Sequence, residues 1–356
     1  MSGATPGAER FEYTPLPERI RDLPAPDEQA AAIIAQRIDE LRNIGRRDPD
    51  TEGTTEQIDG ISYTHHFIEA PGDSELIRWH YVECGSGDPI VFVHGVPCSW
   101  FMWHHQMSAF SGQFRCISVD LKGYGQSDKR TGDYRQEGVA EQLAAALDAI
   151  GIDSFHAVGF DRGAVIIDHL GAKHPARLRS YTRISQHLYH FHPALAPQEM
   201  MFVNPETAAI MRDPVKMVVS AYASAPGHDI SEDDLRREIQ EFAWPQVGWA
   251  VPRYFNSSSF RKEWIDRRTW LMRSWTFPVL VLQGAHDSRQ PVEFYQHVEE
   301  WLPDGRVEFI DAAHFLVFEA PAAEPAAAPA RSDPRILKHR HRPLLGGVTT
   351  LADPTK

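Results

Sequence analysis

Short apolar runs alternate with helix-like segments along the middle of the chain, and this alternation limits the fold more than any other feature. The runs include IVFV at 90–93, CISV at 116–119, HAVGF at 156–160 and VLVL at 279–282. The intervening segments 137–151 and 163–174 have helical periodicity. Continuous apolar strands separated by helices are typical of a parallel sheet covered on both faces. We therefore expect an α/β fold, with its ligand site beyond the carboxyl ends of the strands.

Changes in pattern divide the chain into four parts. We expect the α/β core at 61–185 and 267–321, interrupted at 186–266 by a Trp-, Tyr- and Met-rich, mostly helical cap. Residues 1–60 form an N-terminal extension, in which Ile34, Ile38 and Leu41 fall on one face of a single amphipathic helix. This face predicts docking on the body of the protein or on a second subunit, so both a monomer and a homodimer are open. The Pro-rich segment 322–356 lacks an amphipathic period and is expected to be disordered.

Composition narrows the classes of partner. The 356 residues include 36 Lys and Arg against 49 Asp and Glu, a formal charge of -13 that argues against nucleic acid and anionic membranes. No run reaches the roughly 18 apolar residues of a membrane span, and the N-terminus lacks a signal-peptide pattern. Three cysteines without a CxxC pair favour a reducing compartment, so we expect a cytoplasmic protein acting on a small molecule.

Five polar segments fall where predicted strands end. They are HGVPCSWFMW, DLKGYGQSD, GFDRG, GAHD and AAHF. GFDRG has the small-x-nucleophile-x-small form of the strand-to-helix elbow that exposes a catalytic side chain, but Asp161 stands where a serine is usual. An Asp between two glycines is more often an ordinary turn residue; its place between an apolar strand and a helical segment favours the catalytic interpretation.

Together these segments resemble the epoxide hydrolase and haloalkane/haloacetate dehalogenase branch of the α/β-hydrolase superfamily, from about Gly60 to Pro321. The resemblance implies an α/β-hydrolase fold without a cofactor or metal. It implies that Asp161 is the nucleophile, Asp287 the acid and His314 the base, in the usual chain order of this fold. It also implies an oxyanion hole made of the backbone N–H groups of Val96 and Arg162.

The chemistry of a saturated carbon explains the aspartate. A serine alkylated by an epoxide or an alkyl halide becomes an ether, which a neighbouring histidine and water cannot hydrolyse. An alkylated Asp161 becomes an ester, which His314 and water can hydrolyse, and the oxyanion then forms on Asp161 itself. The expected reaction is the opening of an epoxide to a vicinal diol through an Asp161 ester.

Epoxide hydrolases usually carry two cap tyrosines that hydrogen-bond the epoxide oxygen. WAVPRYFNSS resembles the segment that carries the second, which implies this role for Tyr254, although a packed cap aromatic is the simpler alternative. At the place of the first stand Met200, Met201 and Phe202, so Tyr189, Tyr222 or a histidine of HLYHFH is a candidate substitute. The predicted pocket residues are His94, Trp100, Tyr222 and Trp249; His94 is also a candidate for orienting the HGVP turn.

Other functions stay open on the sequence. Haloacetate dehalogenases have an arginine directly after the nucleophile, as Arg162 is here, but their second carboxylate-binding arginine corresponds to Val165. Haloalkane dehalogenases usually have tryptophan at the position of Arg162. The aromatic cap also suits a bulky, apolar substrate, as in natural-product tailoring enzymes or in relatives that bind without turnover.

Two minor alternatives concern single groups. His187, His190 and His192 could bind zinc together, but no cysteine or carboxylate completes a familiar spacing, so we predict no metal site. Cys98 beside the oxyanion segment could be a functional thiol, but a small buried residue is the more common role.

Overall fold

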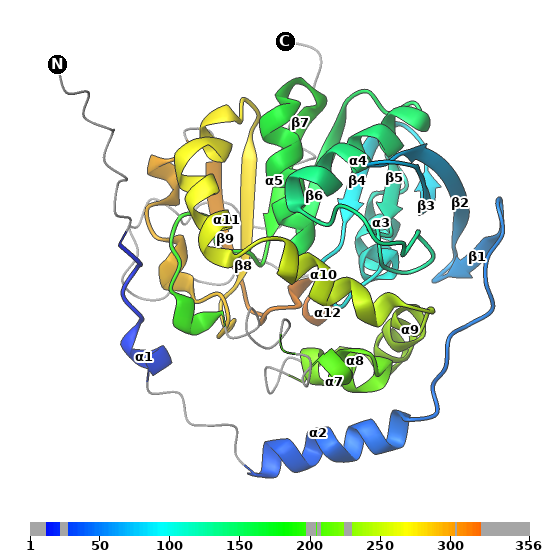
Figure 1. The fold of residues 1–356 in the computed structure, drawn as a ribbon, viewed down its shortest axis with the longest axis horizontal. Helices are drawn as coiled ribbons and strands as arrows, with labels where there is room; N and C mark the ends of the chain where they lie inside the picture. Colours follow the sequence, from blue (N-terminus) through cyan, green and yellow to red (C-terminus); the bar gives the residue numbers. More distant parts are fainter. Residues whose placement is uncertain are drawn as a thin grey trace.

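The computed structural model describes residues 12–21, 28–196, 204, 208–223, 230–302 and 305–321. Its centre is a nine-stranded sheet in the order β1-β2-β3-β5-β4-β6-β7-β8-β9 (Figure 1). The strands are β1 (Thr55–Ile58), β2 (Ile61–Pro71), β3 (Leu76–Gly85), β4 (Asp88–Val93), β5 (Phe114–Val119), β6 (Phe155–Phe160), β7 (Leu178–Ile184), β8 (Val279–Gly284) and β9 (Gly305–Ile310).

The sheet has an antiparallel edge and a parallel body. β1, β2, β3 and β5 pair antiparallel in that order, whereas β5, β4, β6, β7, β8 and β9 run parallel. Every residue of β6 and of β8 is buried, as expected for parallel strands covered on both faces. The sequence-based prediction of a mostly parallel α/β sheet is confirmed.

Helices follow the parallel strands, because each crossover between parallel neighbours needs a long connection. α4 and α5 pack against each other, and α3 packs on β3 and β5. The core helices are α3 (His104–Phe110), α4 (Gln136–Ala149), α5 (Arg162–Lys173) and α12 (Leu316–Glu319). Short turns of helix are η1 (Trp100–Trp103), η2 (Pro175–Arg177), η5 (Arg267–Leu271), η6 (Met272–Ser274), η7 (Val292–Tyr295) and η8 (Val298–Glu300).

The segment between β7 and β8 is helical in its described parts. Its elements are η3 (Pro193–Leu195), α7 (Ala208–Met211), α8 (Pro214–Tyr222), α9 (Glu232–Phe242), η4 (Val247–Trp249), α10 (Ala250–Ser257) and α11 (Phe260–Asp266). Local sequence explains where the two longest begin. The Asp213 side chain caps α8 by accepting from the Lys216 N–H, and Ser231 caps α9 by accepting from the Asp234 N–H. We call the residues 186–266 the cap.

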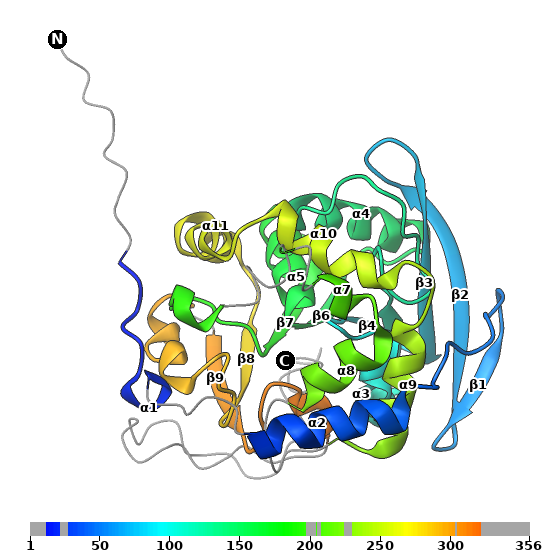
Figure 2. The same cartoon turned by 60° about the horizontal axis from the view of Figure 1, so that its bottom comes forward.

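The predicted N-terminal extension, 1–60, is divided in the structure: its end forms strand β1 at the edge of the sheet, and its longer helix lies along the cap. Helices α1 (Glu18–Arg21) and α2 (Glu28–Leu41) precede the sheet, and α2 runs beside α8 (Figure 2). Leu41 is buried, and Ile34 and Ile38 pack against the same core. The apolar face of α2 therefore docks on this chain's own cap. The predicted disordered tail, 322–356, lies outside the described residues.

Two features of the structure bear on the sequence-based predictions about membranes and disulfides. Among the described residues, none of the helices is long and apolar enough to cross a membrane. Cys84, Cys98 and Cys116 are all unpaired and buried.

Candidate active site

Asp161 occupies a sharp turn between β6 and α5. Its backbone has φ 48° and ψ -117°, a conformation that non-glycine residues rarely adopt and that is typical of a nucleophile elbow. The turn needs small neighbours: a Cβ on Gly163 would lie 2.3 Å from the carbonyl oxygen of Val93. The GFDRG pattern therefore has a steric cause, and it presents the Asp161 carboxylate at the end of a buried strand.

His314 and Asp287 come to Asp161 from the loops after β9 and β8. The Nδ1 of His314 lies 2.8 Å from Oδ2 of Asp287, and its Nε2 lies 3.9 Å from Oδ2 of Asp161. Because the Asp287 carboxylate only accepts hydrogen bonds, Nδ1 is the protonated nitrogen and Nε2 is directed to the nucleophile. The structure thus brings the three predicted residues together in the order expected for a triad.

Asp287 is held as a charged group. Its Oδ1 accepts hydrogen bonds from the backbone N–H groups of Arg289 at 2.8 Å and Gln290 at 3.1 Å, and Gln283 Nε2 donates to its Oδ2 at 3.0 Å. Burial raises the pKa of Asp287, but His314, the charge of Arg289 and the Gln283 hydrogen bond outweigh burial, so the pKa lies below its ordinary value. A charged Asp287 fixes the imidazole orientation and stabilises the imidazolium.

The HGVP segment supplies a backbone donor to the nucleophile itself. The N–H of Val96 donates to Oδ1 of Asp161 over 3.1 Å. Close approach explains the glycine before it, since a Cβ on Gly95 would lie 2.5 Å from Cβ of Asp161. Arg162 is the first residue of α5, where a backbone N–H has no partner within the helix. The Val96 N–H is therefore in place at the Asp161 carboxylate, and the matching role of the Arg162 N–H stays a prediction.

The Arg162 side chain is turned away from this role. Its two terminal nitrogens bind both carboxylate oxygens of Glu263 at 2.8 and 2.5 Å, and both side chains are 2% exposed. The guanidinium also lies 5.2 Å from the ring centres of Phe255 and Phe260. Because the fork of Arg162 is already occupied by Glu263, it is not available to hold a substrate carboxylate.

A cavity of about 360 Å³ opens above the triad, within the range of small-molecule sites. Its floor includes Val96, Asp161 and His314. Most of its wall is apolar and comes from the cap, as in Phe191 and Met217. The lining residues are Val96, Pro97, Asp161, Gln186, His187, Phe191, Leu195, Ala196, Ile210, Met211, Met217, Ser220, Ala221, Phe255, Phe260, Arg289, Gln290, Phe294 and His314.

Tyr254 does not reach this cavity. It is buried beneath the cap, where its hydroxyl donates to the carbonyl oxygen of Lys122 at 3.0 Å and its ring packs edge-on against Tyr134. Tyr189 also lies elsewhere, stacked on Trp301. The structure therefore does not bring Tyr254 to the cavity, because its hydroxyl donates to a backbone carbonyl elsewhere, and its role as a donor to the epoxide oxygen stays a prediction. Met200, Met201 and Phe202 lie outside the described residues.

The four predicted pocket residues are also absent from the cavity lining. Trp249 is 45% exposed on the cap surface, under the guanidinium of Arg212. The hydroxyl of Tyr222 lies 3.3 Å from Sγ of Cys98, and its ring stacks on Phe315. Burial raises the pKa of Cys98 well above its ordinary value, which keeps the thiol protonated and argues against a reactive role.

His94 and Trp100 support the site from below. The Nε2 of His94 accepts from the Leu121 N–H at 3.0 Å, so it links the HGVP turn to the loop after β5. The backbone N–H of Trp100 donates to Asp120 Oδ1 at 2.9 Å, and the Trp100 side chain is fully buried. The structure thus places neither residue in the described lining of the cavity. The interpretation of His94 as a residue that orients the turn is consistent with this contact.

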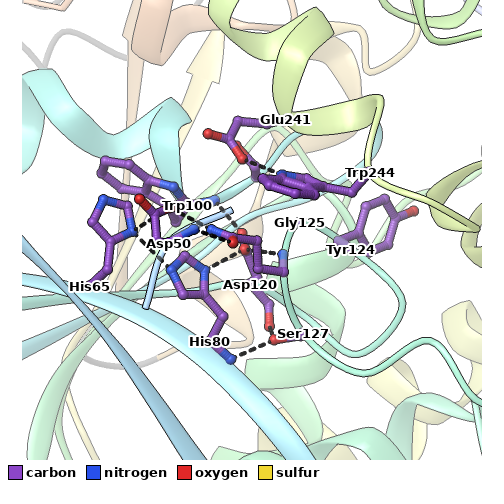
Figure 3. Close-up of polar contacts among 12 residues, drawn as sticks. Asp50, His65, His80, Trp100, Asp120, Tyr124, Gly125, Ser127, Glu241 and Trp244 are labelled. Carbon is purple, nitrogen blue, oxygen red and sulfur yellow. Dashed lines mark hydrogen bonds and ion pairs between the residues drawn. The ribbon is translucent and has the colours of Figure 1, made fainter. Parts of the chain in front are cut away.

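Asp120 is the centre of a buried polar network that joins the sheet, the extension and the cap (Figure 3). His80 lies 2.6 Å from its Oδ2, and the Gln126 N–H donates to the same oxygen. Burial raises the pKa of Asp120, but His80 and the backbone donors outweigh burial, so the pKa is well below its ordinary value. His80 continues the chain to Nδ1 of His65 at 3.0 Å, which lies 3.2 Å from Asp50.

These last three side chains could in principle hold a metal ion, since Asp50, His65 and His80 offer ligand atoms within 4.8 Å of one another. Their atoms already have partners, however. Arg47 pairs with the Asp50 carboxylate, which also accepts from Gln126 Nε2 at 2.6 Å. The structure therefore accounts for this cluster as an ion-pair network.

The zinc alternative in HLYHFH is not supported, because the three rings bind different partners. His187 Nδ1 lies 2.8 Å from Gln290 Oε1, and His190 Nδ1 lies 2.8 Å from the hydroxyl of Thr14. His192 instead caps a helical turn by accepting from the backbone of residue 194. Of the three histidines, His187 lines the cavity. The periodicity of the sequence did not predict that His187 would face a ligand site.

The mostly parallel sheet and the nucleophile elbow define an α/β hydrolase. Residues 88–321, more than half of the chain, match the family model described as the alpha/beta hydrolase fold. The chain therefore belongs to the alpha/beta hydrolase fold family, the superfamily that the resemblance of its motifs implied.

The similar curated proteins include epoxide hydrolases and a haloalkane dehalogenase. The chain is 34% identical over 292 residues to the bifunctional epoxide hydrolase 2 of Rattus norvegicus, which covers 69% of this chain and 52% of the relative. The mouse protein of the same name is 30% identical over 291 residues. A haloalkane dehalogenase of Agrobacterium fabrum is 35% identical over 130 residues, 36% of this chain and 40% of the relative. The chain spans about half the length of the mammalian relatives.

Solved structures share the fold. An epoxide hydrolase from Vigna radiata matches 75% of this chain and 95% of its own, with a TM-score of 0.61 and 21% identity. An inhibitor complex of an epoxide hydrolase from Bacillus megaterium matches 72% of this chain and 95% of its own, with a TM-score of 0.60 and 22% identity.

Proposed function

We propose that this protein hydrolyses epoxides to vicinal diols through a covalent ester on Asp161. The observation that carries the proposal is the Val96 N–H, which donates to an oxygen of the nucleophile itself. In a serine hydrolase the oxyanion forms on the substrate. Here the donor is already at the Asp161 carboxylate, which is where an oxyanion forms when an Asp161 ester is hydrolysed.

The reaction has two steps. In the first, Oδ2 of Asp161 attacks an epoxide carbon, the ring carbon–oxygen bond breaks, and the released alkoxide takes a proton from solvent water. In the second, Nε2 of His314 removes a proton from water, and the hydroxide attacks Cγ of Asp161. The bond between Cγ and the substrate oxygen then breaks, and His314 returns its proton to that oxygen. The diol departs, and the Asp161 carboxylic acid loses a proton to solvent, which restores the carboxylate and balances the proton taken up in the first step.

The separation of 3.9 Å between His314 and Asp161 supports the second step. This separation is longer than a hydrogen bond, so the imidazole does not hydrogen-bond the Asp161 carboxylate. A single water molecule can therefore lie between Nε2 of His314 and Cγ of Asp161, the atom that it attacks. The apolar cavity walls favour a substrate with a substantial apolar body.

Halide displacement would use the same nucleophile, but neither of the two positions at which the resemblance places a carboxylate-binding arginine offers one to the cavity. Arg162 is paired with Glu263, and Val165 is buried in α5. Ligand binding without turnover does not explain why a His–Asp pair faces a strained Asp161.

A three-way substrate panel tests the proposal. The full chain is incubated with epoxides, halo-acids and aryl esters, and diol, halide and carboxylic acid release are followed in parallel. We expect diol formation with at least one epoxide that has an apolar substituent. Halide or aryl acid release without diol formation would contradict the proposed reaction.

A further inference from the structure

The polar part of the cavity wall is built from two short segments. Apart from Asp161, His314 and Ser220, its polar residues are Gln186 and His187 after β7, with Arg289 and Gln290 after β8. Gln290 Oε1 accepts from the backbone N–H of His187 at 2.7 Å, and Gln290 Nε2 donates to Gln186 Oε1 at 3.3 Å. We call Gln186, His187, Arg289 and Gln290 the polar wall. Its internal hydrogen bonds fix its shape before any ligand arrives.

Arg289 gives this wall its charge. Its Nη2 donates to the carbonyl oxygen of Ala221 at 3.2 Å. Within the described part of the chain, no carboxylate forms an ion pair with it. Arg162 and Arg183, by contrast, each bind both oxygens of a carboxylate. A guanidinium has five N–H donors, so Arg289 retains capacity for a bidentate anion.

The surroundings of Arg289 favour an anion from the cavity. Burial lowers the pKa of Arg289 below its ordinary value, whereas Asp287, Asp161 and Glu319 act to raise it. The guanidinium nevertheless stays protonated in the physiological range because its ordinary pKa exceeds 12. Burial and nearby arginines, Arg267 first, lower the pKa of His187 well below its ordinary value, so His187 is neutral. Arg289 is therefore the positive charge of the polar wall.

We propose that the polar wall binds a carboxylate of the substrate, with the Arg289 guanidinium as its ion partner. This proposal rests on the proposed function and specifies its substrate class: an electrophile with a carboxylate, whose apolar body lies against Phe191, Phe255 and Phe260. The positive charge of Arg289 also offsets the repulsion between an anionic substrate and Asp161, which lines the same cavity. Specificity for acids over neutral analogues follows.

Unreactive ligands test this site without turnover. We would titrate the full chain with 4-phenylbutyrate and 4-phenylbutyramide, which share an apolar body and differ in charge, by isothermal titration calorimetry. We expect the acid to bind about tenfold or more tightly than the amide, as a charge-assisted pair predicts. Arg289→Gln should remove this preference, and Arg236→Gln, which removes an exposed arginine of α9, should preserve it.

A change of the opposite sign strengthens the test. Asp161→Asn removes the negative charge from the same cavity, so it should tighten binding of the acid several-fold and leave the amide unchanged. Arg289→Lys keeps the charge and loses the fork, so it should reduce the preference only in part, and it serves if the glutamine variant does not fold. Equal binding of acid and amide by the wild type, no binding of the acid, or an acid preference that survives Arg289→Gln would overturn the proposal.

These results are separable from the hydrolase mechanism because neither ligand contains an epoxide. A protein that prefers the acid but never forms an ester on Asp161 would retain the carboxylate site and lose the proposed reaction. A protein that forms the ester with neutral epoxides and shows no acid preference would do the reverse.

Discussion

Arg162 and Glu263 form a bidentate ion pair in which both side chains are 2% exposed. The pair joins the first turn of α5, directly after the nucleophile, to α11 of the cap. A buried pair is costly to break, because the remaining charge has no partner and little water. This contact therefore ties the cap to the elbow.

We predict that Glu263→Gln lowers the free energy of unfolding by about 3 kcal/mol. Urea unfolding followed by circular dichroism measures this change. The control is Asp39→Asn, which breaks an exposed pair with Arg42 at the end of α2 and should cost less than about 0.5 kcal/mol. Equal effects of the two substitutions would mean that the buried pair does not stabilise the fold.

Tyr254→Phe separates a structural role from a catalytic one. Because its hydroxyl donates to Lys122, the substitution should cost about 1 kcal/mol of stability and change epoxide turnover by less than about threefold. Steady-state kinetics and urea unfolding on the same preparation give both numbers. A fall in turnover of about 10²-fold with unchanged stability would instead restore Tyr254 as the donor to the epoxide oxygen.

The network around Asp120 predicts a pH dependence of stability. The pKa of Asp120 is lowered in the folded protein, so its stabilising contribution is present above the unfolded pKa of about 3.9 and is lost as the pH falls through the folded pKa. Asp120→Asn should therefore be less stable than the wild type at pH 7, and the gap should shrink below about pH 4. A gap that stays constant or widens on acidification would show that the charge of Asp120 is not the cause.

The sequence predicted the parallel body of the sheet because β4, β5, β6 and β8 contain short apolar runs with turn residues after them. The antiparallel strands β1 and β2 mix polar and apolar residues without a clear alternation. Some of these polar side chains have partners within the sheet, as His65 does with Glu56. Hydrophobic periodicity alone therefore did not reveal the two strands. The triad was predictable for a related reason: each member follows a strand and sits in a short, sterically constrained motif.

The cap was not predictable at the level of single residues. Tyr222 and Tyr254 are aromatic residues of the cap, but tertiary packing decides whether such a ring faces a cavity or a core. Arg289 stands two residues after Asp287. That no carboxylate of the described residues forms an ion pair with it becomes visible only when the loops after β7 and β8 are placed side by side. The spacing of residues along the sequence does not show whether the Arg289 guanidinium meets a carboxylate in the folded protein.

Asp161→Asn tests the nucleophile at almost constant shape. The amide oxygen can still accept from the Val96 N–H, so the fold and the binding of neutral ligands should be preserved. Turnover should fall by about 10⁴-fold or more, because an amide does not attack a saturated carbon. Freshly purified protein and a thermal melt beside the kinetics distinguish lost chemistry from lost structure. Undiminished turnover would remove Asp161 from the mechanism.

The most direct measurement of the central claim uses His314→Gln and intact-protein mass spectrometry. Alkylation of Asp161 needs neither His314 nor water, whereas hydrolysis of the ester needs both, so this variant should react once with a turned-over epoxide and then stall. We predict a mass increase equal to the whole substrate, mapping to the peptide that contains Asp161. A single turnover of the wild type in ¹⁸O-water should place the label in Asp161, since water attacks Cγ of the enzyme ester. A labelled diol from that first turnover, with unlabelled Asp161 and no adduct in the variant, would contradict the covalent mechanism and make Asp161 a general base.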